Sequence, residues 1–122
     1  VKGWLDADGE THEQVFDVSW SDPDQRMRGA DGKVPSVGSS VNEREATYTN
    51  AIGAPILTGY WKDPAFDPTQ KSFYYVRVIE IPTPTWLAYD RKNYNLYDEM
   101  PATAPYTSQE RAYTSPIWYN PS

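Results

Sequence analysis

The alternation of apolar and polar residues predicts short β-strands along much of this chain. Residues 1–5 have the pattern of a strand, and the Asp8-Gly9 pair that follows is typical of the turn of a β-hairpin. Apolar and polar side chains alternate again over residues 14–20, as expected of a half-buried strand. These two segments therefore predict one antiparallel hairpin.

The strongest strand pattern covers residues 72–81, where large apolar side chains occupy both faces, which is typical of a central strand. Shorter β-favouring runs at residues 45–50 and 55–62 predict two more strands. A last strand is expected over residues 113–119, and Pro116 favours an edge position for it because proline cannot donate to a ladder.

Two long segments separate these strands. Residues 21–41 are rich in Asp, Gly, Ser and Pro and predict a loop, which is unusually long for a compact domain. Residues 86–105 form the second long segment, and a short helix is expected at its start, over residues 85–92.

The number and spacing of the strands predict an all-β fold, an antiparallel β-sandwich that forms a single module over residues 1–122. Phe66-Asp67-Pro68 ahead of Tyr74 is similar to the corner tyrosine of immunoglobulin and fibronectin type III folds, whose hydroxyl bonds to the backbone just upstream. The alternative is an ordinary strand that contains a tyrosine.

Composition narrows the classes of partner. The 122 residues carry a net charge of −6, which disfavours nucleic acid because a phosphate backbone is repelled by an acidic surface. No apolar run approaches the roughly 18 residues that a membrane span needs. The chain starts at Val1 inside a predicted strand, so we expect it to be a piece of a larger protein. The sandwich is then incomplete, and an exposed sheet edge favours self-association.

The residues offer little catalytic chemistry. His12 is the only histidine and cysteine is absent, so a zinc site or a cysteine nucleophile is not expected within the chain. Asp6, Asp8 and Glu10 are weak candidates for a calcium loop, and the alternative is a solvated acidic turn. We expect no catalytic residue and no cofactor in these residues.

Several side chains are candidates for contact with a ligand or a neighbouring domain. Exposed aromatic rings can stack on sugars, although aromatic residues of β-modules are more often buried. The Glu110-Arg111 pair lies beside aromatic residues and is either structural or a docking element. Asp63 and Asp67, each followed by proline, are typical of turns. The aromatic candidates are Trp61, Trp86, Tyr89, Trp118 and Tyr119.

A family resemblance covers nearly the whole chain. It rests on residues 1–4, 16–18, 61–68, 73–80 and 82–86, and most specifically on the motif at residues 109–119. These stretches resemble the C-terminal part of the bacterial family named domain of unknown function 3604.

The resemblance implies a longer parent protein. The N-terminal part of that family is similar to the polymerase-and-histidinol-phosphatase superfamily of metal-dependent phosphoesterases, and many members are exported, which implies a periplasmic setting. None of the metal-binding motifs lies in this chain, so no catalytic residue carries over to it.

Three hypotheses about function follow. The first is a non-catalytic accessory β-sandwich that packs against a metal-dependent hydrolase domain of the same polypeptide. The second is a carbohydrate- or ligand-binding module, and the third is an independent enzyme. The first predicts an exposed apolar patch, and the second predicts at least two coplanar exposed aromatic rings in a groove.

Overall fold

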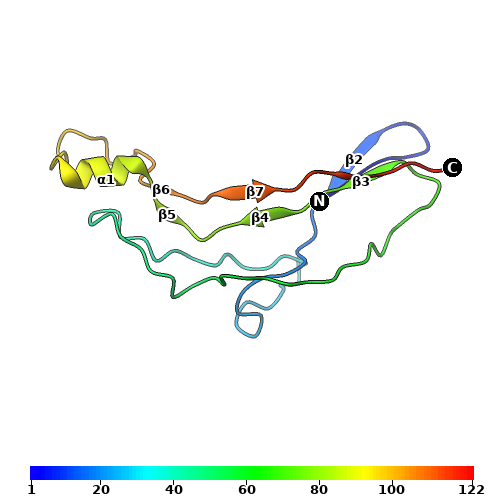
Figure 1. The fold of residues 1–122 in the computed structure, drawn as a ribbon, viewed down its shortest axis with the longest axis horizontal. Coiled ribbons are helices and arrows are strands. Elements are labelled where there is room, and N and C mark those ends of the chain that lie inside the picture. The colour runs from blue at the N-terminus through cyan, green and yellow to red at the C-terminus, as the bar shows by residue number, and fades with distance from the viewer. The chain divides into compact units, whose positions relative to one another are not determined.

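The computed structural model describes all residues from 1 to 122 and shows a mainly β fold with one short helix (Figure 1). The strands of these sheets pair antiparallel. The strands are β1 (Lys2–Leu5), β2 (Thr11–Gln14), β3 (Ser72–Tyr74), β4 (Arg77–Ile79), β5 (Thr83–Pro84), β6 (Thr107–Ser108), β7 (Arg111–Tyr113) and β8 (Ile117–Tyr119), and the helix is α1 (Trp86–Asn93).

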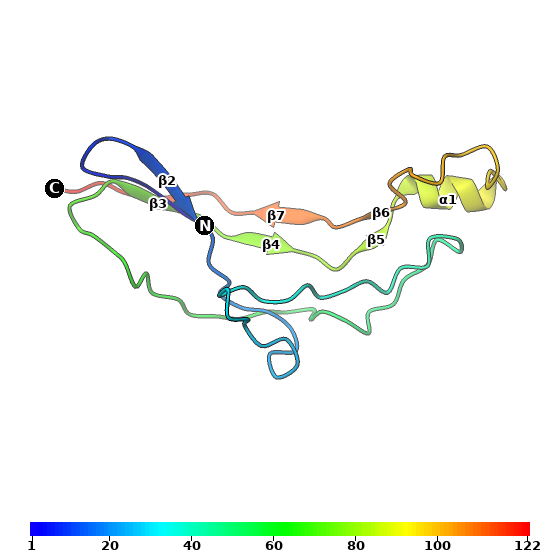
Figure 2. The same ribbon diagram turned by 180° about the vertical axis from the view of Figure 1, so that it is seen from behind.

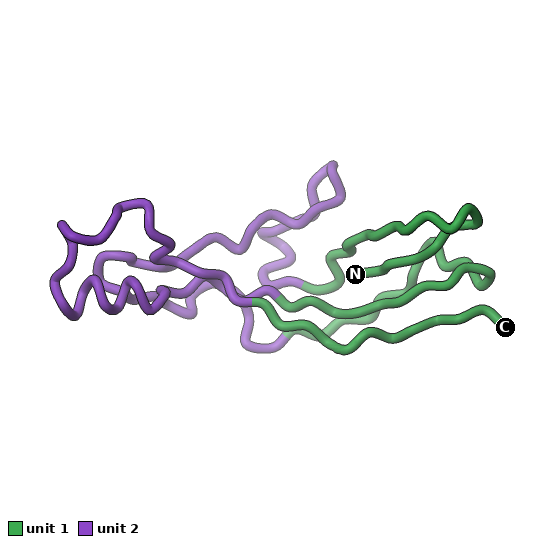
Figure 3. The backbone as a smooth tube through the Cα atoms, turned by 90° about the horizontal axis from the view of Figure 1, so that it is seen from above, with its two compact units in different colours: residues 1–19, 57–78, 111–122 green, residues 20–56, 79–110 purple.

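The chain divides into two compact units (Figure 3). Unit 1 contains residues 1–19, 57–78 and 111–122, and unit 2 contains residues 20–56 and 79–110. Each unit therefore combines segments that are far apart in the sequence.

Unit 1 is built on a four-stranded sheet with the order β2-β1-β3-β8, in which each neighbouring pair is antiparallel. The view from behind shows β2 and β3 close to the N-terminus (Figure 2). The structure confirms the predicted hairpin of β1 and β2, the inner position of β3 and the edge position of β8. Gly9, in the hairpin loop, has φ 82°, a left-handed conformation that glycine adopts without strain.

Three predicted strands are wrong in position or extent. The strand expected over residues 113–119 is divided into the end of β7 and the whole of β8, with Pro116 in the gap. The return strand of the hairpin is Thr11–Gln14, not residues 14–20. The reason lies in the loop, where the Asp6 carboxylate accepts hydrogen bonds from the N–H groups of Asp8 and Glu10. This closes the turn early, so pairing with β1 starts at Thr11.

The predicted strand at residues 72–81 is divided into β3 and β4, with a break at Tyr75 and Val76. The N–H of Val76 donates to the hydroxyl of Thr114 at 3.0 Å rather than to a backbone carbonyl. Pro116 follows two residues later and has no N–H to offer. The ladder with the last segment of the chain is therefore interrupted here.

The strands expected at residues 45–50 and 55–62 are absent. An isolated bridge between Asn42 and Thr47 is all that forms around the first. Residues of the second lie beside residues 18–19, where the Ser19 hydroxyl donates to the carbonyl of Thr58 at 2.9 Å. No strand ladder forms between these two segments. The layer that they form in unit 1 is therefore irregular, and we call it the irregular layer.

Unit 2 contains a small apolar core. Its buried members are Ala46, Ala88 and Tyr106, and Leu87, Met100 and Ala104 pack against them. The helix predicted at residues 85–92 is confirmed as α1, which contributes Ala88. The structure also confirms that residues 21–41 contain no helix or strand.

Removal of one buried hydroxyl is expected to destabilise unit 2. Tyr106 is 2% exposed, and its hydroxyl donates to the carbonyl of Pro101 at 2.6 Å. Tyr106→Phe is expected to lower the free energy of unfolding by about 1 kcal/mol, because the hydrogen bond made by the buried residue is lost. Urea unfolding followed by tyrosine and tryptophan fluorescence measures this. Tyr94→Phe, at a 72% exposed position, is the matched control and should change nothing measurable.

Candidate functional site

The sheet of unit 1 has two faces with different surroundings. Residues paired across neighbouring strands point to the same face, and successive residues alternate between faces. The row that we call the open-face row consists of Glu13, Gly3, Phe73 and Trp118. The rows on the other face, the covered face, contain Lys2 with Tyr74, and Trp4 with Ser72 and Tyr119.

A buried ion pair holds residues 57–70 against the covered face. The Lys2 Nζ lies 2.6 Å from the Asp63 Oδ2, and both side chains are almost inaccessible to solvent. Lys2 also donates to the carbonyl of Ala65 at 2.9 Å, and the hydroxyl of Tyr74 donates to the same Asp63 oxygen at 2.7 Å. This network is a structural clamp between the sheet and its irregular layer.

The ionisation of this network opposes a role in proton transfer. Burial acts to raise the pKa of Asp63, but hydrogen bonds from Lys2, Tyr74 and the N–H of Ala65 lower it below the ordinary value. Burial and the neighbouring carboxylate raise the pKa of Tyr74. Near neutral pH the aspartate stays ionised and the tyrosine stays protonated, whereas a general acid or base is poised near the working pH.

The same contacts show that the predicted corner-tyrosine bond of Tyr74 does not form. The hydroxyl of Tyr74 was expected to bond to the backbone upstream, but it bonds to the side chain of Asp63. An ionised carboxylate is a stronger acceptor than a neutral carbonyl, and Lys2 holds this one in place. The Asp-Pro turns themselves are confirmed, since Asp63 and Asp67 each accept from the N–H two residues later.

Aromatic rings pack around the clamp. The ring of Trp61 lies 4.8 Å from that of Phe16 and 6.2 Å from that of Tyr74. Phe66 contacts Tyr119 edge to face at 4.9 Å. The predicted contact residue Trp61 is therefore part of the interior of unit 1, half-buried between the sheet and the layer that covers it.

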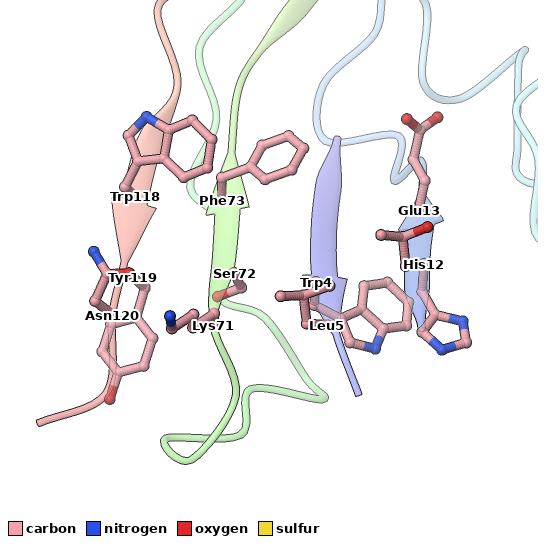
Figure 4. Close-up of a pocket in the computed structure, with 11 residues that line it drawn as sticks. Trp4, Leu5, His12, Glu13, Lys71, Ser72, Phe73, Trp118, Tyr119 and Asn120 are labelled. Carbon is pink, nitrogen blue, oxygen red and sulfur yellow. The ribbon is translucent and has the colours of Figure 1, made fainter. Parts of the chain in front are cut away.

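A groove of about 410 Å³ lies over the sheet of unit 1 (Figure 4). The rings of Phe73 and Trp118 come from neighbouring strands, with centroids 5.1 Å apart and planes tilted by 45°. Trp118 is 67% exposed. The Phe73 ring lies over Gly3, which has no side chain. A Cβ atom at that position would collide with the ring. Polar residues that line the groove include Thr11, Glu13, Lys71 and Asn120.

The other predicted contact residues do not gather at this groove. Trp86 and Tyr89 are exposed on α1 in unit 2, and Glu110 is exposed in the same unit. Arg111 is exposed on β7 in unit 1. Of the seven candidate contact residues, Trp118 and Tyr119 line the groove.

The acidic turn has a structural role. Both oxygens of Asp6 are engaged, one by the N–H groups of Asp8 and Glu10 and the other by the His12 ring at 2.6 Å. His12 also stacks on Trp4, with ring centroids 5.2 Å apart. The structure contains no group of three or more His, Cys, Asp or Glu side chains that could hold a metal ion.

Three features of unit 1 were missed from the sequence. Lys2 was not expected to be buried, because a strand pattern does not show which lysine will meet a carboxylate. Phe73 was placed on a strand but not in a groove. Glu13 was not among the candidate residues. Strand alternation could have placed Glu13 and Gly3 on one face, had the hairpin register been known.

The clamp predicts a matched pair of mutational effects. Asp63→Asn removes the partner of a buried lysine and is expected to destabilise the chain by about 3–5 kcal/mol. Asp67→Asn alters an equivalent Asp-Pro turn that has no ion pair, and should cost much less. Chemical denaturation near pH 7 compares the two variants.

The lowered pKa of Asp63 also gives a pH dependence. The folded state favours the ionised carboxylate, so the stabilisation is fully present above the unfolded value of 3.8 and is lost as the pH falls through the lower folded value. Stability of the natural chain should therefore fall below about pH 4, more steeply than that of Asp63→Asn. Equal slopes for both chains would contradict the assignment.

The comparisons with known proteins give one match. The profile of the family described as "Protein of unknown function (DUF3604)" matches residues 1–121. No curated protein matches the chain, and neither does any solved structure. No helix in the structure has the length and apolarity that a membrane crossing requires. Since the profile covers almost every residue, the chain belongs to the DUF3604 family.

Proposed function

We propose that residues 1–122 act as a non-catalytic accessory module that packs against a metal-dependent hydrolase domain of the same polypeptide. The observation that carries the proposal is a large exposed apolar surface over a small core. Three hydrophobic residues are buried in the whole chain, namely Ala46, Ala88 and Tyr106. All three belong to unit 2, so unit 1 has no fully buried hydrophobic side chain of its own.

The accessible surface supports this reading. A compact protein of 13.9 kDa is expected to expose about 6,700 Å², and two separate compact halves about 8,000 Å². The chain exposes 9193 Å². The excess over two separate bodies exceeds the share of about 800 Å² that one partner buries in a stable interface.

The docking surface proposed for unit 1 is the outer side of its irregular layer. The rings of Phe16 and Trp61 on this layer pack on each other, and Trp61 also packs on Tyr74 of the sheet. Val15 and Tyr60 beside them are exposed. We call this surface the outer patch, and Tyr60, at 88% exposed, is its most accessible member. The outer patch consists of Val15, Val18, Leu57 and Tyr60.

The same layer supports an immunoglobulin-like sandwich as the complete fold. Residues 15–20 and 57–62 both have strand-like sequences and already lie side by side, since a Cβ atom on Gly59 would be 3.2 Å from Val18. A domain needs two packed layers around a core. We propose that docking of the partner domain orders these two segments into the second sheet.

A charge placed on the outer patch tests the docking surface. In the full-length protein, Val18→Asp is expected to lower the melting temperature and to increase proteolysis at residues 15–20 and 57–62, because the charge would be buried without a partner. Limited proteolysis and calorimetry measure this. Met27→Asp, at a 71% exposed position outside the patch, is the control. Equal effects of both variants would contradict the proposal.

A comparison of the fragment with the full-length protein tests the accessory role. With added Mn²⁺, the full-length protein is expected to hydrolyse a model phosphomonoester. Residues 1–122 alone are expected to show no hydrolysis. Turnover by the fragment at a rate similar to the full-length rate would establish an independent enzyme instead.

A further inference from the structure

We infer that the groove on the open face of unit 1 binds a neutral oligosaccharide, with one sugar ring stacked on Trp118 and the tilted Phe73 ring against its edge. This site is independent of the docking surface proposed above. The groove residues Glu13, Phe73 and Trp118 lie on the open face, whereas the outer patch belongs to the layer over the covered face.

The aromatic rings supply a platform. Trp118 is 67% exposed although it lies in a strand, and its ring is braced by that of Phe73 at 5.1 Å. One face of a sugar ring presents C–H groups, which are apolar and carry a weak positive charge. The face of an aromatic ring carries a weak negative charge. A sugar ring with equatorial hydroxyls therefore stacks on the exposed Trp118 ring and directs its hydroxyls sideways, and the Phe73 ring, tilted by 45°, contacts its edge.

Polar side chains line the rest of the groove, where the hydroxyls of further sugar units would lie. Glu13 stands at the far end of the open-face row from Trp118, and its carboxylate can only accept hydrogen bonds at neutral pH. Lys71 donates, and the amide of Asn120 does both. All three line the groove. Donors and acceptors together suit hydroxyl groups, which need both.

The width of the row sets the size of the ligand. Glu13 and Trp118 are on β2 and β8, with β1 and β3 between them. Three inter-strand spacings amount to about 14 Å. This exceeds the length of one sugar ring, so the groove fits a short oligosaccharide better than a monosaccharide.

Charge and composition favour a neutral sugar over the other occupants. The core of a protein interface is depleted of charged residues, whereas Glu13 and Lys71 both line this groove. A polyanion would meet a chain with a net charge of −6. Aromatic walls with a few polar groups, and a volume of about 410 Å³, match the sites that hold small ligands.

The test titrates residues 1–122 with cellohexaose, xylohexaose and chitohexaose, by calorimetry and by quenching of tryptophan fluorescence. Binding of at least one of these is expected. Trp118→Ala should weaken it at least tenfold, while Trp118→Phe should retain part of it because the stacking surface is reduced rather than lost. Trp86→Ala is the matched control, since Trp86 is 70% exposed on α1 in unit 2 and does not line the groove. It should leave binding unchanged.

A second variant separates loss of the site from loss of the fold. Glu13→Ala changes an exposed β2 side chain, should preserve the circular dichroism spectrum and should weaken binding several-fold. Val18→Asp, which tests docking, should not affect sugar binding. The inference is overturned if no neutral hexasaccharide binds at millimolar concentration. Equal losses for Trp118→Ala and Trp86→Ala, or tighter binding of polygalacturonate than of the neutral sugars, would also overturn it.

Discussion

The architecture of unit 1 depends on the buried pair of Lys2 and Asp63. A lysine and an aspartate removed from water are costly unless each is matched by close partners. Here Asp63 is paired with Lys2 and accepts a hydrogen bond from the hydroxyl of Tyr74. Lys2 also donates a hydrogen bond to the carbonyl of Ala65. Because these contacts join β1 and β3 to residues 63–65, they determine where the irregular layer crosses the sheet. Rings such as Trp61 then fill the space around this fixed point.

The pair also determines what the opposite face presents. Successive residues of a strand alternate, so burial of Lys2 on the covered face sends Gly3 to the open face. A shift of the register by one residue would exchange the faces. Lys2 would then lie beside Phe73, and the space that Gly3 leaves for that ring would vanish. One buried charge pair therefore fixes the composition of the groove as well as the layer behind it.

The sequence predicted local features of unit 1 better than pairings between distant segments. The hairpin turn, the inner strand at Phe73 and the edge strand after Pro116 follow from turn chemistry, apolar periodicity and the missing N–H of proline. The extent of β2 did not follow from these patterns, because the carboxylate of Asp6 accepts hydrogen bonds from two backbone N–H groups and strand pairing starts early. The pairing of Lys2 with Asp63 spans sixty-one positions, and no local pattern encodes it. Residues 55–62 have strand propensity but lack a partner edge, which propensity does not report.

The chain has a small apolar core, yet the groove residues of unit 1 keep a defined arrangement. Burial of apolar side chains stabilises a fold but does not depend on their orientation. An ion pair with several hydrogen bonds fixes the orientation of its groups, at a cost in desolvation. Lys2 and Asp63 can thus hold the sheet in register while the outer side of the layer, with Tyr60 exposed, remains available to a partner. Burial of that surface would add the missing apolar stabilisation. It would do so from the covered side, so Phe73 and Trp118 would keep their positions on the open face.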